Sequence, residues 1–216
     1  MTDYILKDFT PLTLQSTVSQ AQALCIEHAV SHVPIIKGAK LIGCFSQNDI
    51  QSLEDKNQKL SDFTDVFDHF CAHISESALE FLKIFADNDA NIIPVIDTNN
   101  YIGYYELNTV LELFSSTPFL TTDGFILVVE KNSKEYSMSE AVQIIESNNA
   151  ILLGCFISHK TTDKVELTLK VVSQEINEII QTFRRYNYVI ITEHTDDFYL
   201  EELKNRADYL QKYLNT

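Results

Sequence analysis

Tryptophan is absent from the 216 residues, and glycine and proline are scarce, with 5 and 4 copies. So few chain breakers in a chain that is 45% hydrophobic indicate regular elements joined by short loops, and they exclude a disordered chain. No apolar run approaches the roughly 20 residues that would span a bilayer. The N-terminus is acidic where a secretory signal is basic, so we expect a cytoplasmic protein without a membrane partner.

Basic residues are also few. The 16 Lys and Arg stand against 31 Asp and Glu, which gives a formal net charge of −15. This balance excludes nucleic acid as the main partner, because a phosphate backbone demands a basic surface. Arginine is missing altogether from residues 1–116. An anion site in that half would therefore depend on backbone N–H groups, hydroxyls or lysine.

Cysteine pairs with metal-site spacing are missing as well. The four cysteines lie in apolar stretches, which suits small buried side chains in a reducing compartment. Two groups could be drawn as zinc sites: Cys25, His28 and His32, and His69, Cys71 and His73. Neither supplies four ligands at a recognised spacing, so we predict no metal. No nucleophile-elbow, P-loop, zinc-protease or dinucleotide motif occurs, and we predict that the protein is not an enzyme.

What the sequence does contain is an internal repeat at an offset of 60 residues. The stretch 33–36 (VPII) matches 93–96 (IPVI), and 41–45 (LIGCF) matches 101–105 (YIGYY), without a gap. Each copy predicts a helix, an X-Pro strand, a turn, a strand that crosses a glycine, and a second helix. We place those second helices at about 47–55 and 107–115. One copy alone exposes an apolar sheet face, so we expect the two copies to pack together.

This order resembles a tandem pair of CBS domains (named after cystathionine β-synthase), also called a Bateman module. The resemblance covers repeats at about 5–56 and 62–115, within a predicted domain over 1–116. It implies a regulatory sensor of adenine nucleotides rather than a catalyst. The ligands it implies are AMP, ADP, ATP or S-adenosylmethionine, none of them required as a cofactor.

The resemblance also implies site residues. Residues 43–49 read Gly-Cys-Phe-Ser-Gln-Asn-Asp and match the family's Gly-h-h-[Ser/Thr]-x-x-Asp motif, in which Ser46 would face phosphate and Asp49 ribose. A helix capping box explains the same two residues without any ligand, and this alternative stays open. The second repeat has Glu106 and Thr109 instead, so we expect no second site of this kind. The remaining positions implied at the nucleotide are Pro11, Thr13, Val33 and Ile35.

The repeat stops near residues 114–118. Strands are predicted at 125–129, 151–157, 165–171 and 188–192, with one helix opened by a Ser137-x-x-Glu140 capping box and another carrying Ile176, Ile179, Ile180 and Phe183. The order βαββαβ is ferredoxin-like. After a CBS pair it resembles an ACT domain, which we place at 117–196. The loop 130–136 lacks the glycine usual in ACT domains that bind amino acids, so we expect a dimerising role.

Residues 197–216 predict an amphipathic helix with a leucine stripe, lying either on its own domain or across a dimer. The sequence therefore predicts a mixed α/β regulatory protein. We expect a homodimer through the CBS and ACT-like domains that acts on an unidentified regulated protein. The alternative is a ligand-free CBS/ACT module that serves as an assembly platform for a partner enzyme or transporter.

Overall fold

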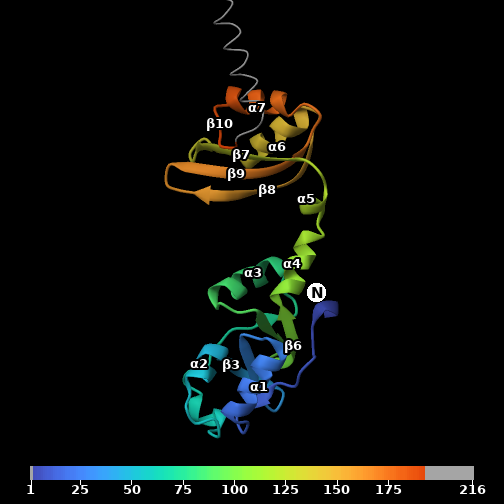
Figure 1. Ribbon diagram of the computed structural model, residues 1–216. Coiled ribbons are helices and arrows are strands. Elements are labelled where there is room, and N and C mark those ends of the chain that lie inside the picture. Colours follow the sequence, from blue (N-terminus) through green and yellow to red (C-terminus); the bar gives the residue numbers. More distant parts are fainter. Residues whose placement is uncertain (1, 193–216) are drawn as a thin grey trace, which may run out of the picture. The chain divides into compact units, whose positions relative to one another are not determined.

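The computed structural model describes residues 2–192, which divide into two compact units after Ser116 (Figure 1). Each unit contains its own sheet and its own helices, and the mixed α/β fold class predicted from the sequence is confirmed. The predicted C-terminal helix at 197–216 lies outside the described residues.

The first unit contains the two repeats, separated by a linker with a short 3-10 turn, η2 (Leu60–Phe63). The first repeat comprises β1 (Leu12–Thr13), α1 (Val18–His28), β2 (His32–Lys37), β3 (Lys40–Ser46) and α2 (Gln47–Ser52). The second comprises β4 (Ala72–His73), α3 (Ala78–Asp87), β5 (Ile92–Asp97), β6 (Asn100–Glu106) and α4 (Leu107–Ser115). Another 3-10 turn, η1 (Thr2–Tyr4), precedes them.

Local chemistry explains where the helices begin. Thr17 and Ser77 each cap a helix, and Gln20 and Glu80 complete reciprocal capping boxes. One predicted boundary is wrong: α2 ends at Ser52 rather than near residue 55. Leu53 takes an extended conformation and its side chain packs against the core of the first repeat, so burial of this leucine ends the helix early.

The six strands of the first unit form one sheet in the order β1-β2-β3-β6-β5-β4. The order is symmetric about its centre, where Lys40 of β3 pairs with Asn100 of β6, two positions that are equivalent at the offset of 60. Registers repeat as well. Val33 lies opposite Phe45 in one hairpin, as Ile93 lies opposite Tyr105 in the other.

A second pair of equivalent residues joins the repeats. The Ser31 N–H donates to Asn91 Oδ1 over 2.8 Å, and the Asn91 N–H donates to Ser31 Oγ over 2.9 Å. Asn91 Nδ2 also donates to the carbonyl of Ala29 over 2.8 Å. The local symmetry axis therefore passes between Ser31 and Asn91 as well as between the central strands.

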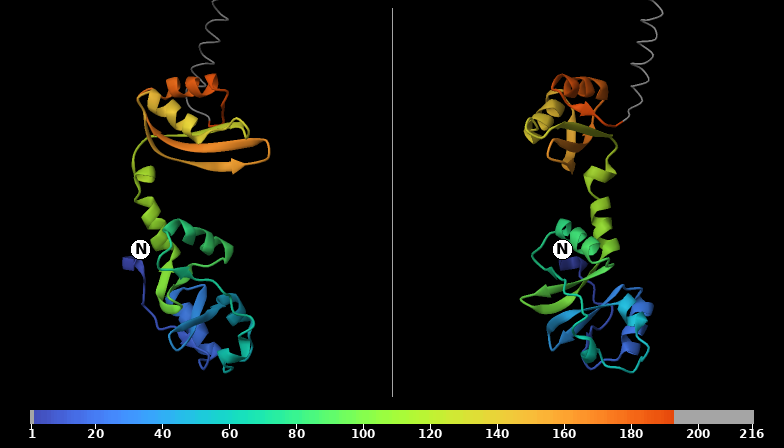
Figure 2. Two further views of the ribbon diagram at one scale, coloured as in Figure 1. Left: turned by 180° about the vertical axis from the view of Figure 1, so that it is seen from behind. Right: turned by 90° about the vertical axis from the view of Figure 1, so that its left-hand side faces the viewer.

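The second unit comprises α5 (Pro118–Thr121), β7 (Phe125–Asn132), α6 (Met138–Ser147), β8 (Ile151–Lys160), β9 (Lys164–Val172), α7 (Ile176–Arg185) and β10 (Val189–Ile190). Its strands form an antiparallel sheet in the order β10-β7-β9-β8, which is the ferredoxin-like arrangement. Helices α6 and α7 lie together on one face of this sheet (Figure 2). The likeness to ACT domains in particular stays a prediction.

The capping box predicted for α6 is only half formed. Ser137 Oγ accepts the Glu140 N–H, but the Glu140 carboxylate forms an ion pair with Lys131, with Nζ at 2.5 Å from Oε1. Lys131 is buried on β7 and also lies 4.5 Å from the centre of the Tyr188 ring. A buried ammonium needs a carboxylate more than an exposed helix end does, so the ion pair takes the Glu140 side chain.

Candidate functional site

Ser46 and Asp49, the residues of the predicted nucleotide motif, lie together at the end of β3. Ser46 Oγ accepts the Asp49 N–H over 3.1 Å and donates to Asp49 Oδ2 over 2.6 Å. Ser46 is half-buried and Asp49 is exposed. The capping interpretation is thus half confirmed. The Ser46 hydroxyl caps α2, but the Asp49 carboxylate accepts from that hydroxyl and not from the Ser46 N–H, as a full capping box would require.

His32 lies directly across the strand pair from Ser46, and no motif in the sequence assigns it a role at this site. Its side chain is buried, with Nε2 at 3.4 Å from Asp68 Oδ2 and Nδ1 at 2.9 Å from Ser31 Oγ. The His32 and Phe70 rings form a T-shaped contact, with their centres 5.2 Å apart. A comparison of the repeats could have identified His32, because the equivalent position in the second repeat has the apolar Ile92.

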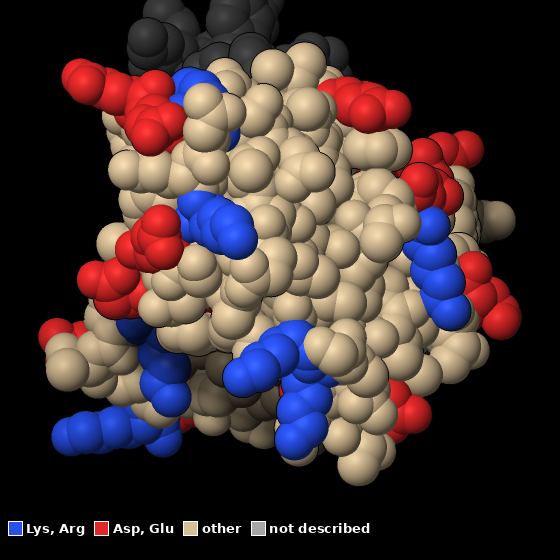
Figure 3. All heavy atoms as spheres, turned by 90° about the horizontal axis from the view of Figure 1, so that it is seen from below, with Lys and Arg blue, Asp and Glu red and all other residues tan. Residues whose placement is uncertain are grey.

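The surroundings of this pair are acidic. Burial lowers the pKa of His32, and Asp68, Asp49 and Asp89 oppose that shift by favouring the charged imidazolium. Three carboxylates therefore act on the one buried imidazole beside Ser46. Figure 3 shows one face of the molecule, on which lysines are spread over uncharged surface and acids lie around the margin. A polyanion at Ser46 would be repelled by the carboxylates of Asp49, Asp68 and Asp89.

The other predicted nucleotide residues lie along β1 and β2. Thr13 pairs with Ile36, at the opposite end of β2 from His32, and its hydroxyl accepts the Gln15 N–H. Val33 and Ile35 are fully buried in the core of the first repeat. Only backbone atoms of these two could meet a ligand, so the structure does not bring their side chains to Ser46.

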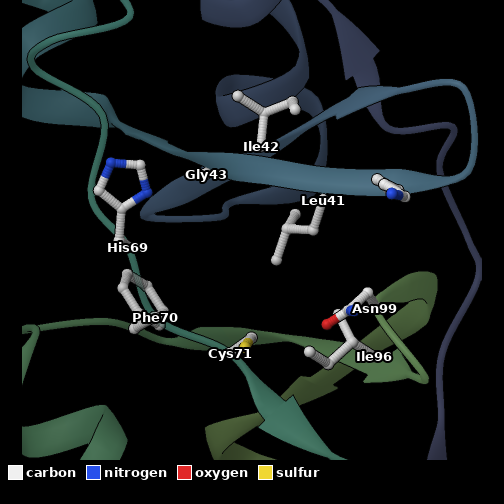
Figure 4. A pocket seen from close by; sticks show the side chains of 9 residues that line it. Leu41, Ile42, Gly43, His69, Phe70, Cys71, Ile96 and Asn99 are labelled. Carbon is white, nitrogen blue, oxygen red and sulfur yellow. The ribbon is translucent and has the colours of Figure 1, made fainter.

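Two clefts lie at equivalent places in the repeats. The first cleft, of about 350 Å³, is lined by Lys40, Leu41, Ile42, Gly43, His69, Phe70, Cys71, Ile96 and Asn99. Figure 4 shows Leu41 directed from β3 toward Cys71 and Ile96, while Ile42 points to the other side of the strand. The second cleft, of about 380 Å³, is lined by Lys7, Phe9, Thr10, Pro11, Tyr101, Ile102 and Gly103. Pro11 of the predicted site thus lines the second cleft, and neither cleft is lined by Ser46 or Asp49.

The clefts correspond because the repeats exchange their leading segments. The segment before the second repeat pairs with the first at Asp68 and Cys44, and the segment before the first repeat pairs with the second at Leu6 and Tyr104. A glycine lies beside each crossing. A Cβ at Gly103 would lie 2.4 Å from the Leu6 carbonyl oxygen, so this position requires the bare backbone.

The cysteines and histidines singled out in the sequence do not form a metal site among the described residues. Within residues 2–192, no three His, Cys, Asp or Glu side chains gather as ligands of one ion would. Cys25 and Cys44 are buried, whereas Cys71 and Cys155 are partly exposed, so the expectation that all four are buried is half right. Burial raises the pKa of the Cys25 thiol to about 11. None of the helices of the described part is long and apolar enough to cross a membrane.

The fold and site define a class of protein: a symmetric tandem α/β repeat with one polar Ser-Asp pair, followed by a ferredoxin-like unit. No family model matches the chain. It is 24% identical over 160 residues to inosine-5'-monophosphate dehydrogenase of Methanocaldococcus jannaschii, covering 73% of this chain and 32% of that protein. It is 28% identical over 123 residues to the same enzyme of Korarchaeum cryptofilum, covering 56% and 25%. The chain therefore spans about a third or less of the length of these curated relatives.

Among solved structures, the chain is similar to a CBS domain pair/ACT domain protein of Thermotoga maritima. The TM-score is 0.46 at 16% identity, and the match covers 52% of this chain and 93% of that one.

Proposed function

We propose that this chain is a non-enzymatic regulatory module whose first repeat binds an adenosine-containing small molecule at Ser46 and Asp49. Binding then alters the geometry of a homodimer or of a partner protein. The observation that carries the proposal is the hydrogen-bonded Ser46–Asp49 pair at the junction of β3 and α2. The equivalent end of β6 has Glu106, which makes no capping bond, so the first repeat has the pair and the second does not.

The charges around the pair favour a ligand with few negative charges. Asp49, Asp68 and Asp89 all act on His32 beside Ser46, and no arginine occurs in residues 1–116 to offset them. Helix α2 has only six residues, so its dipole offers little to a phosphate chain. Among the ligands that the CBS resemblance implies, S-adenosylmethionine, with its positive sulfonium, suits this environment better than ATP.

Calorimetric titration tests the proposal with adenosine, AMP, ATP and S-adenosylmethionine as ligands. We expect S-adenosylmethionine and adenosine to bind at least ~10-fold more tightly than ATP, a difference of about 1.4 kcal/mol. Asp49→Asn should weaken binding, because an amide NH2 replaces one of the two carboxylate oxygens that would accept from the ribose hydroxyls. Ser46→Ala should weaken binding less. Thr109→Val, at the position equivalent to Asp49, is the matched control and should leave binding unchanged.

Three outcomes would contradict the proposal in different ways. Binding that survives both Ser46→Ala and Asp49→Asn would place the ligand elsewhere in the chain. ATP binding more tightly than S-adenosylmethionine would show that the carboxylates do not select the ligand. No binding of any of the four would favour the ligand-free platform.

A further inference from the structure

A third cleft, of about 290 Å³, lies between the end of α1 and the start of α4, so both repeats contribute to it. Most of its lining is polar, and neither lysine nor arginine takes part. Its volume is just below the usual range for ligand pockets, so it suits a compact molecule. The residues that line it are His28, Ala29, Asn91, Glu106, Leu107 and Asn108.

Glu106 brings a negative charge to this cleft. Its side chain is half-buried at the N-cap position of α4 and makes no capping bond. None of the ion pairs within residues 2–192 involves Glu106. A half-buried carboxylate loses part of its hydration, and no cation of the described chain offsets that loss. A positively charged ligand would supply the missing partner.

The surroundings of Glu106 add negative charge to the cleft. Burial raises the pKa of Tyr104 to about 12, and the carboxylates of Asp8 and Glu106 contribute to that rise. Both carboxylates are therefore close enough to act on the same phenol. The N-terminus of α4 offsets only about half a charge. The cleft thus favours cations over anions.

The other walls of the cleft are held in place by contacts of their own. The His28 ring packs against Phe9 with the ring centres 5.1 Å apart, and Phe9 stacks on Tyr104 at 4.6 Å. The Asn91 side chain uses both its oxygen and its nitrogen in the hydrogen bonds that join the repeats. The walls are therefore formed before a ligand arrives, which lowers the cost of binding.

We propose that the third cleft binds a small primary ammonium compound, with the ammonium group beside Glu106. Such a group donates three hydrogen bonds, and the cleft offers the Glu106 carboxylate, the Asn108 side-chain oxygen and a neutral His28 nitrogen as acceptors. A metal ion fits less well, because within the described residues no three His, Cys, Asp or Glu side chains gather as its ligands. The proposal does not depend on the Ser46–Asp49 site, so either can fail alone.

An NMR titration of the isotope-labelled full chain tests this, with butylamine as the probe. We expect saturable shifts of the backbone N–H signals of Ala29, Leu107 and Asn108. Butanol and butyrate have the same chain length but no positive charge, and neither should produce these shifts. This comparison uses the unaltered chain, so it tests the proposal even if a substitution disturbs the fold.

Two glutamine variants of α4 identify the carboxylate. Glu106→Gln should weaken butylamine binding at least ~10-fold, because it removes a hydrogen bond to a charged group. Glu112→Gln removes the same charge from an exposed position of the same helix and should change the affinity less than ~2-fold, since an exposed charge is screened. Ser46→Ala should leave butylamine binding unchanged, which separates this cleft from the proposed adenosine site.

The proposal is overturned if butylamine causes no saturable shift at the cleft, or if butanol shifts the same signals as strongly. Equal weakening by Glu106→Gln and Glu112→Gln would show that only the overall charge attracts the amine. A loss of binding in Ser46→Ala would place the amine at the first repeat's polar pair. Binding that needs both the positive charge and Glu106 supports the proposal.

Discussion

The two repeats of the first unit share one order of strands and helices but differ in their polar residues. Both hairpins have matching registers, with an irregularity at the same place, between Ile35 and Ile36 and between Val95 and Ile96. Each hairpin is crossed by the segment that leads into the other repeat. Apolar positions tolerate exchange between similar side chains, so the core and the register persist in both copies.

The differences gather at one end of the central strands. The first repeat has His32 and Ser46 side by side, where the second has Ile92 and Glu106. His32 contacts Asp68 of the linker, whereas Ile92 is simply buried. The comparison teaches that the packing of the repeat does not require these polar residues. In the first repeat these residues have local structural roles, since Ser46 caps α2 and His32 contacts Asp68, and the proposed ligand would give them a second role.

The largest difference we expect between the repeats concerns their glycines. Gly103 has a φ of +145°, and a Cβ there would lie 2.4 Å from both Ile5 Cγ2 and the Leu6 carbonyl oxygen. Gly43 has ordinary backbone angles and its nearest neighbours would lie at 3.0 Å. Gly103→Ala should lower the free energy of unfolding by about 3 kcal/mol through strain and overpacking. Gly43→Ala should lower it by about 1 kcal/mol. Equal losses in chemical denaturation would show that the two crossings are equivalent.

Substitutions of Asn91 test the hydrogen bonds that join the two repeats at their symmetry axis. Asn91→Ala removes the side-chain bonds to the Ser31 N–H and the Ala29 carbonyl, so it should cost about 1–2 kcal/mol. Asn91→Ser copies the equivalent residue of the first repeat and keeps an oxygen for the Ser31 N–H. We therefore expect its loss to be about half as large. A serine variant no more stable than the alanine variant would show that the Ala29 bond dominates.

The repeat allowed most of the fold to be predicted from the sequence. Pro34 and Pro94 in register, and Gly43 and Gly103 in register, mark the same strands, and the strands occur where they were expected. Strict alternation in β9 likewise predicted which residues are buried. These features depend on neighbours close in the sequence or at a fixed offset, which is why a pattern reveals them.

The site was harder to predict because its partners come from outside the pattern. Asp68 lies in the linker, and no local spacing connects it to His32. Glu140 was assigned to a helix cap by its spacing, yet Lys131 on a neighbouring strand takes its carboxylate. In both cases a buried basic group selects the acid that reaches it, and a capping motif cannot reveal that competition.

A smaller effect concerns the caps of the second helices. Ser46 caps α2, whereas Glu106 makes no side-chain bond at the start of α4. Ser46→Ala should lower the free energy of unfolding by about 1 kcal/mol. Glu106→Ser should raise it by about 0.5 kcal/mol, because a serine there can accept an orphan N–H. Thermal unfolding without ligand measures both, and a stability loss on Glu106→Ser would mean that this glutamate has a structural role.

The subtlest difference between the repeats is their response to acid. Burial lowers the pKa of His32 in the folded protein below its ordinary value of 6.5, so the unfolded chain binds this proton more readily. The stability that neutral His32 supports is therefore complete above about pH 6.5 and is lost as the pH falls through the folded pKa.

His32→Ile, which copies the second repeat, should remove this part of the pH dependence. We expect urea unfolding from pH 8 to pH 5 to show a smaller loss of stability in the variant than in the unaltered chain. If His32→Ile becomes less stable on acidification as steeply as the unaltered chain, Asp68 and its neighbours stabilise the imidazolium enough to cancel burial. The carboxylates around Ser46 would then act on a charged group, and the case for an uncharged or cationic ligand would weaken with it.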